Sequence, residues 1–241
     1  MRLNRYLASC GVASRRKCED IIRSGRVHIN GEVEENPFFS LMPEDTIMLD
    51  DQEMIFQHEP EIIVLNKPAD YITTTHDTHD RKTVMELVQT NKRLFPIGRL
   101  DKDTTGVLLL TNDGDLSNRL THPKYQVEKV YRVHFQGLLS NDEIEHINSG
   151  VIIGSDEVGK GDVLSQNEVS KTVTEIKLKL TEGKKREVRR IFSSLGYKVL
   201  ALQRISFGGI TTKGLKPGHW RRLSEEEILS LRGKMAVSDI V

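Results

Sequence analysis

The chain has 241 residues, of which 37% are hydrophobic and 29% charged, a composition typical of a globular protein with one or two domains. No window approaches the roughly 18 apolar residues that a membrane-spanning helix needs, and the first residues lack the apolar stretch of a secretory signal. These features exclude a membrane protein and a secreted disulfide scaffold, so we expect a cytoplasmic protein. The formal net charge is zero.

That zero arises because segments of opposite charge cancel. Residues 1–31 carry seven Lys/Arg and two acids, residues 32–61 carry ten acids and no Lys/Arg, and residues 184–222 carry eleven Lys/Arg and one acid. Two separate basic regions favour a polyanion such as RNA bound at two places. The alternative is that these charges only form solvated faces.

The first 31 residues predict a small unit of two helices and a hairpin. Apolar residues recur at helical spacing over 3–10 and 18–22, the two helices end near Gly11 and Gly25, and Ser14 can cap the second. The strand over 26–29 enters an Asn30-Gly31 turn, which is a strong hairpin signal. Cys10 and Cys18 fall on apolar helix faces and are expected to be packed thiols. The basic residues expected on the outside of this unit are Arg2, Arg5, Arg15, Arg16, Lys17, Arg23 and Arg26.

The remaining sequence predicts an α+β domain. An acidic linker over 49–60 separates the N-terminal unit, residues 1–48, from a second domain over 61–236, and residues 237–241 form a tail. Strands and short helices follow one another without regular βαβ alternation, which favours a largely antiparallel sheet.

Three segments of the second domain each place one polar residue beside an apolar face. Asp101 precedes the apolar run 107–110, where a carboxylate loses hydration and needs a partner. Alternation along 127–135 puts Tyr131 on the face of Val133 and Phe135. In the helix that begins near 187, Arg189 borders the buried stripe, whereas Arg186 and Arg190 point away from it. Arg189 is therefore the cation expected to approach Asp101.

These three groups suit a reaction at a sugar carbon, where positive charge develops and a flat base is held against a ring. An ordinary glycosidase needs a second carboxylic acid to protonate its leaving group. Uracil N1 is a better leaving group, so one carboxylate can suffice, and no metal or organic cofactor is required. Taken alone, Asp101 could instead cap a turn, Tyr131 could be core packing, and Arg189 could form a surface ion pair. Asp103 is expected to be a turn residue.

Other motifs are interpreted as structural. Residues 154–161 nearly spell a phosphate-binding loop, but Gly161 replaces the hydroxyl that would hold magnesium, so a hairpin loop is expected. The polar loop 76–80 has metal-binding residue types without a further ligand cluster, and no metal site is predicted. Ser140 and Ser224, each three residues before a glutamate, predict capping boxes.

Long stretches of the chain resemble known RNA-modifying enzymes. The order of helix, SRR, helix and SGRVHING resembles the alpha-L RNA-binding motif. The segments GRLDKDTTGVLLLT, HPKYQVEKVYRV, EGKKREVRRIFSSLGYKVLALQRISFGGI and GLKPGHWRRLSEEEI resemble, in order and spacing, the RsuA/RluB group of ribosomal RNA pseudouridine synthases. By this resemblance Asp101 is the essential carboxylate, either as nucleophile at C1′ or as the base that starts a glycal route.

The resemblance implies roles for other residues as well. Tyr131 should stack on uracil and is the candidate for removing the C5 proton, Arg189 should pair with Asp101, and Arg99 should fill the gap left by the flipped nucleotide. The RNA-binding residues are expected to be Arg2, Arg5, Arg15, Arg16, Lys17, Arg26, Lys184, Lys185, Arg186 and Arg190.

We therefore expect a monomeric, cofactor-independent enzyme that isomerises uridine in ribosomal RNA. The REVRR segment resembles the large-subunit-acting members of this group more than the small-subunit enzyme, which implies large-subunit (23S) RNA, either as a stem-loop or within an assembly intermediate. The alternatives are a small-subunit (16S) enzyme and a non-catalytic ribosome-assembly factor. The sequence does not indicate which uridine is modified or how many are.

Overall fold

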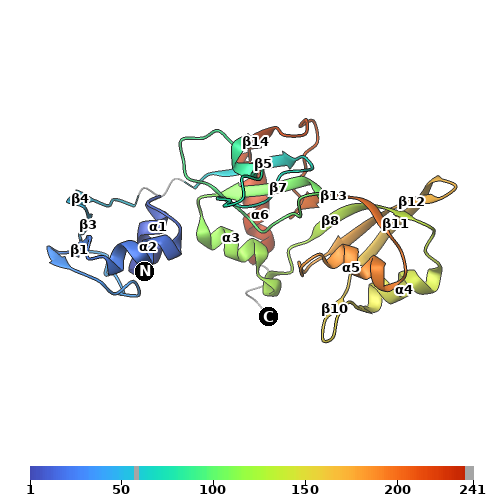
Figure 1. Ribbon diagram of the computed structural model, residues 1–241, viewed down its shortest axis with the longest axis horizontal. Helices are drawn as coiled ribbons and strands as arrows, with labels where there is room; N and C mark the ends of the chain where they lie inside the picture. Colours follow the sequence, from blue (N-terminus) through green and yellow to red (C-terminus); the bar gives the residue numbers. More distant parts are fainter. Residues whose placement is uncertain (57–59, 237–241) are drawn as a thin grey trace. The chain divides into compact units, whose positions relative to one another are not determined.

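The computed structural model describes residues 1–56 and 60–236, with the backbone alone from 234 onward (Figure 1). Residues 57–59 of the predicted linker and the predicted tail 237–241 lie outside the described residues. The chain divides into two compact units: residues 1–61 with the short segments 91–93 and 112–114, and the rest of the chain. No helix among the described residues is long and apolar enough to cross a membrane.

The first unit combines two helices with a four-stranded sheet. Its elements are α1 (Leu3–Ser9), α2 (Arg15–Arg23), β1 (Val27–Ile29), β2 (Glu32–Val33), β3 (Ile47–Leu49) and β4 (Gln52–Glu53). The sheet order is β2-β1-β3-β4. Leu3 and Leu7 of α1, Cys18 and Ile22 of α2, and Val27 of β1 are fully buried and form the core. The two helices predicted from apolar spacing are confirmed.

The Asn-Gly hairpin is confirmed, but part of the predicted linker is not a linker. Ile29 pairs with Glu32 across the turn, and both Asn30 (φ 53°) and Gly31 (φ 89°) have the left-handed backbone that such a tight turn requires. β3 ends at residue 49 and β4 lies within 49–60, so the first part of the predicted linker completes the sheet. Their acidic composition concealed the short strands. The domain boundaries given above stay predictions.

The second unit is built around an eight-stranded sheet. Its strands are β5 (Ile62–Lys67), β6 (Phe95–Pro96), β7 (Thr105–Thr111), β8 (Lys129–Gln136), β11 (Asp162–Ser170), β12 (Val173–Leu180), β13 (Val199–Phe207) and β14 (Trp220–Arg222). The helices are α3 (Gly114–Thr121), α4 (Asn141–Ser149), α5 (Glu187–Ser194) and α6 (Glu225–Ala236), with 3-10 turns η1 (Val84–Leu87) and η2 (Pro123–Tyr125).

The strand order is β11-β12-β8-β13-β7-β5-β14, with β6 beside β7. All neighbours are antiparallel except β13 and β7, which run parallel over two residue pairs, Gln203 with Thr105 and Arg204 with Gly106. The predicted α+β class on a largely antiparallel sheet is confirmed. The short parallel pair joins two halves of the sheet: β11-β12-β8-β13, and β7-β5-β14 with β6.

Gly106 permits this junction. A Cβ at this position would lie 2.2 Å from the Arg204 carbonyl oxygen, and its φ of 98° is a conformation that side chains disfavour. The glycine in the segment TTGVLLLT therefore lets the two strands approach.

The central strands are buried on both faces, which explains their continuous apolar sequences. Ile63 and Leu65 of β5 pack into one core cluster with Val133 and Phe192, whereas Val64 joins a second cluster on the other face. Figure 1 shows α3 and α6 beside the half that contains β5 and β7, and α4 and α5 beside β8, β11 and β12.

The local motifs interpreted as structural are also as predicted. β9 (Val151–Ile152) and β10 (Val158–Gly159) form a hairpin, so residues 154–161 do not form a phosphate-binding loop followed by a helix. The side chain of Ser140 accepts from Glu143 N and that of Glu143 accepts from Ser140 N, which makes a capping box; Ser224 and Glu227 repeat it.

Candidate active site

Asp101 lies in a loop whose backbone is held on both sides by buried side chains. The Thr73 hydroxyl donates to Leu100 O (2.8 Å) and accepts from Leu100 N (3.2 Å). On the other side, the ammonium of Lys67 donates to Lys102 O (3.1 Å) and Thr104 O (2.8 Å). The carboxylate position is thereby fixed relative to the sheet.

Lys67 is fully buried at the end of β5. Burial lowers its pKa to about 8, an effect opposed by the nearby carboxylates, Asp103 first and then Asp101. Besides the loop carbonyls it donates to Pro68 O (3.0 Å), so all three ammonium hydrogens have acceptors.

Tyr131 is 9% exposed and lies on β8, on the buried face that includes Val133 and Phe135. The partial burial predicted from alternation is confirmed. The same alternation places Lys129 on this face, where it is 7% exposed. Its ammonium donates to Val127 O (3.0 Å) and Thr181 O (3.2 Å).

The start of α5 brings a different arginine to Asp101 from the one predicted. Arg186 occupies the N-cap with a left-handed backbone (φ 53°), and its Nη1 lies 3.5 Å from Asp101 Oδ2. Arg189 instead binds Asp103, with 2.6 Å between Nη2 and Oδ2. The prediction that Arg189 pairs with Asp101 is therefore wrong for this structure. The helical wheel could not place Arg186, because its left-handed backbone turns it out of the helical register.

These groups meet at a cavity of about 320 Å³. It is lined by Asp101 and Tyr131, by Arg99 from the loop before Asp101, and by Lys184, Lys185 and Arg186 from the segment before α5. Arg189 and Arg190 are not among its lining residues. The Asp101 side chain is 36% exposed, so the carboxylate is half-buried and open to a ligand.

The cavity carries an excess of positive charge. Among the described residues, six Lys/Arg side chains and two acids line it, the cations being Arg99, Lys129, Lys184, Lys185, Arg186 and Arg204 and the acids Asp101 and Glu187. Burial raises the pKa of Glu187, which is 4% exposed. The cavity is thus suited to an anionic ligand that presents a reacting atom to Asp101.

Two of the predicted RNA-binding residues near the cavity are held by neighbouring protein groups. Lys184 pairs with Glu182 (2.6 Å), which raises its pKa, and donates to Val158 O. Arg190 pairs with Glu157 and donates to Ile153 O (2.9 Å). Lys185 is exposed.

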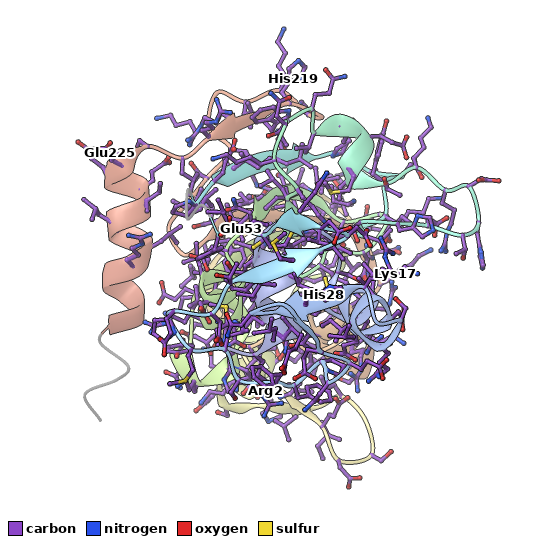
Figure 2. The ribbon with its side chains drawn as sticks, turned by 90° about the vertical axis from the view of Figure 1, so that its left-hand side faces the viewer. Arg2, Lys17, His28, Glu53, His219 and Glu225 are labelled. Atoms are coloured by element: carbon purple, nitrogen blue, oxygen red, sulfur yellow. The ribbon has the colours of Figure 1, made fainter. Side chains whose placement is uncertain are left out.

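In the first unit, Arg2, Arg15, Arg16, Lys17 and Arg26 are exposed, and Arg5 is half-buried. Asp50 forms a bidentate pair with Arg26, whose pKa it raises. Figure 2 labels Lys17, which lies on α2, and Glu53, which lies on β4, so these two charges belong to different elements of this unit.

The polar loop 76–80 is organised by an ion pair. Asp77 binds Arg81 (2.6 Å) and accepts from the backbone of His79 and Arg81, which holds the pKa of Asp77 well below its usual range. The described residues contain no group of three or more metal-ligating side chains.

Sequence reasoning missed Lys67, Thr73, Lys129 and Arg204. Two lysines gave visible signals of buried charge: Lys67, two residues after the apolar run IIVL, and Lys129, which shares the alternation of Tyr131. Arg204, 3% exposed, likewise falls within a strand. Nothing local distinguishes Thr73.

Family models match both units. Residues 61–194 match the model described as RNA pseudouridylate synthase, and residues 1–47 match the S4 domain. A half-buried aspartate, an arginine beside it and a tyrosine in one cavity thus occur in an RNA-acting isomerase that carries an S4 domain. The chain belongs to the RNA pseudouridylate synthase family, as a member of the RsuA/RluB type.

Individual relatives cover nearly the whole chain. A protein of Bacillus subtilis named ribosomal large subunit pseudouridine synthase B is 35% identical over 96% of this chain and 95% of its own length. A protein of Escherichia coli named ribosomal small subunit pseudouridine synthase A is 37% identical, over 96% and 100%. A solved structure titled pseudouridylate synthase has a TM-score of 0.68 and 29% identity, over 96% of this chain and 99% of its own.

Proposed function

We propose that this enzyme converts one or a few uridines of large-subunit ribosomal RNA to pseudouridine, as a monomer and without a cofactor. The observation that supports it best is the single cavity that contains Asp101, its partner Arg186 and Tyr131. All three come from one chain, so a second copy is not needed to complete the site. The REVRR segment favours the large subunit over the small one.

In this mechanism Asp101 acts on the ribose, either by adding to C1′ or by removing a proton in a glycal route. The bond between C1′ and N1 breaks and the uracil turns. C5 then bonds to C1′ as the ester bond between Asp101 and C1′ breaks or, in the glycal route, as the proton returns to C2′. The C5 proton is then lost and N1 gains one. Tyr131 stacks on the ring and is the candidate for removing that proton. Arg186 pairs with the Asp101 carboxylate and orients it.

The uridine must leave its helix to reach Asp101, because C1′ and N1 of a stacked base are inaccessible to a side chain. Arg99, which is exposed at the cavity, is the candidate to occupy the gap. Extrusion costs a few kcal/mol. Phosphate contacts from Lys185 and from the basic surface of the first unit offset that cost.

The test uses ribosomal RNA tritiated at uracil C5. The wild type should release tritium to water, whereas Asp101→Asn should release none and still bind RNA. Asp103→Asn is the matched control, because Asp103 binds Arg189 and does not line the cavity. Release by Asp101→Asn at the wild-type rate would contradict the assignment.

The choice between large-subunit and small-subunit RNA is tested separately, by mapping pseudouridines in ribosomal RNA from cells with and without the gene. Loss of a modification from large-subunit RNA supports the proposal. Loss from small-subunit RNA alone assigns the enzyme the other substrate, for which the Escherichia coli relative is named.

A further inference from the structure

Two buried cations line the same cavity as Asp101 and have no part in the mechanism described so far. Lys129 of β8 and Arg204 of β13 are 7% and 3% exposed. Both lie over the ring of Phe207, with Lys129 Nζ 5.5 Å and Arg204 Cζ 4.7 Å from its centroid. A charged group buried to this degree is costly unless it is fully paired.

Neither cation is fully paired. Lys129 donates to Val127 O and Thr181 O, which leaves one of its three hydrogens without a bond to any described residue. Arg204 Nε donates to Val107 O (2.7 Å), but its buried Nη2 has no partner among the described residues. The acids that lie near enough to Lys129 to act on its charge are Glu187 and Glu182.

Glu187 does not neutralise the pair. Its Oε2 accepts from Lys184 N (3.0 Å), while Oε1 is buried without a partner among the described residues. No ion pair joins it to Lys129 or Arg204 among the described contacts. Two cations therefore face a cavity in which one acid, Glu187, compensates them in part and the other, Asp101, is paired with Arg186.

The proposed reaction produces an anion in the cavity that these cations line. When the bond between C1′ and N1 breaks, its electron pair leaves with N1, and the uracil carries a negative charge spread over N1, O2 and O4. That charge disappears when C5 bonds to C1′ and the C5 proton is replaced by one at N1. Donors fixed in a desolvated site stabilise such transient charge more strongly than water does.

We propose that the ammonium of Lys129, assisted by the guanidinium of Arg204, binds the detached uracil and stabilises its negative charge during isomerisation. This inference rests on the proposed function, because it places a uridine in the cavity. Burial lowers the pKa of Lys129 to about 8, so the side chain stays mainly protonated at neutral pH and is poorly hydrated.

The competing explanation is that Lys129 only ties β8 to the Thr181 carbonyl. Single-turnover rates and RNA affinities separate the two. Lys129→Met should lower the rate of pseudouridine formation about 100-fold while the RNA Kd stays within about twofold, since the lost interaction exists only after bond cleavage. Lys179→Met, on the neighbouring strand and paired with Asp162 outside the cavity, should match the wild type.

A substrate with a better leaving group gives the sharper test. Fluorine at C5 withdraws electrons and stabilises the departing base, so RNA containing 5-fluorouridine depends less on Lys129. Consumption of 5-fluorouridine in a single turnover should show a Lys129→Met deficit about tenfold smaller than on uridine RNA. An equal deficit on both RNAs, or a loss confined to Kd, would overturn the inference.

Lys129→Gln and Lys129→Arg cover the case in which the methionine variant does not fold. Glutamine keeps a donor for the two carbonyls without the charge, whereas arginine keeps the charge. A slow glutamine variant and a faster arginine variant support the inference, and the reverse order overturns it. Wild-type turnover on ribosomal RNA, measured in parallel, tests the proposed function itself.

Discussion

Lys67 bears a charge at a fully buried position, and two of its three bonds, to Lys102 O and Thr104 O, also hold the loop on which Asp101 lies. Those bonds compensate only part of the lost hydration, since its pKa is about 8 in the folded protein and 10.5 as the ordinary value. Lys67 therefore positions the Asp101 carboxylate, and burying its charge lowers the stability of the fold.

This cost predicts a pH dependence of stability. Between pH 8 and 10.5 the unfolded chain binds a proton at Lys67 that the folded chain has released, so stability rises with pH there. Relative to Lys67→Met, the free energy of unfolding of the wild type should rise by about 1.4 kcal/mol per pH unit in that window. Urea unfolding followed by fluorescence of the single tryptophan, Trp220, measures it. Lys129 titrates in both proteins, so its contribution cancels in the difference between them. Equal pH dependence of the free energy of unfolding in the two proteins would contradict the expectation.

Arg186 combines strain with function, because its left-handed backbone is unfavourable for a residue with a Cβ. Arg186→Gly should leave the free energy of unfolding unchanged or raise it by up to about 1 kcal/mol. The single-turnover rate should fall at least about tenfold, because Asp101 loses its partner.

Arg189→Gly is the control for this variant. Glycine inside α5 should cost about 1 kcal/mol of stability. Urea midpoints and tritium release report the two quantities. An Arg186→Gly variant that is less stable than the wild type would contradict backbone strain at Arg186. A variant with the wild-type rate would contradict its role beside Asp101.

At the scale of elements, the sequence predicted the features that depend on neighbouring residues alone. The Asn30-Gly31 turn, the apolar stripe of α5 and the face of Tyr131 follow from turn geometry and periodicity, and each is found. Asp101 and Tyr131 line one cavity, and their catalytic roles stay predictions. The partner of Asp101 was not predicted correctly, because Arg186 reaches it only through a backbone conformation that periodicity does not encode. The parallel pairing of β13 with β7 is likewise a long-range contact without a local signal.

Substitution of Gly106 measures how much the pairing of β13 with β7 contributes to the free energy of unfolding. Gly106→Ala places a Cβ against the Arg204 carbonyl, so we expect a loss of at least about 2 kcal/mol in stability. Gly114→Ala, where a Cβ meets nothing within 4 Å, should lie within about 0.5 kcal/mol of the wild type. Urea unfolding with Trp220 fluorescence compares the two. Similar midpoints would show that the strands separate at little cost.

At the scale of the whole molecule, a neutral chain binds a polyanion because its charges are segregated. Replacing Arg15, Arg16 and Lys17 together with alanine should weaken RNA binding and reduce the slope of log Kd against log salt by about 2. The single-turnover rate at saturating RNA should not change, since the cavity is intact. Arg26→Ala removes a charge that Asp50 already neutralises, so its effect on the slope should be smaller. If the triple variant has the wild-type slope of log Kd against log salt, α2 does not contact RNA phosphates.

The parallel contact between β13 and β7 spans only two residue pairs, yet it joins the strand half that leads out of the Asp101 loop to the half that bears Tyr131 and Lys129. The position of Asp101 relative to Tyr131 therefore depends on this contact between the two halves of the sheet. Substitutions at Thr105, Gly106 or Gln203, which form this contact without lining the cavity, should therefore change turnover without touching the nucleoside.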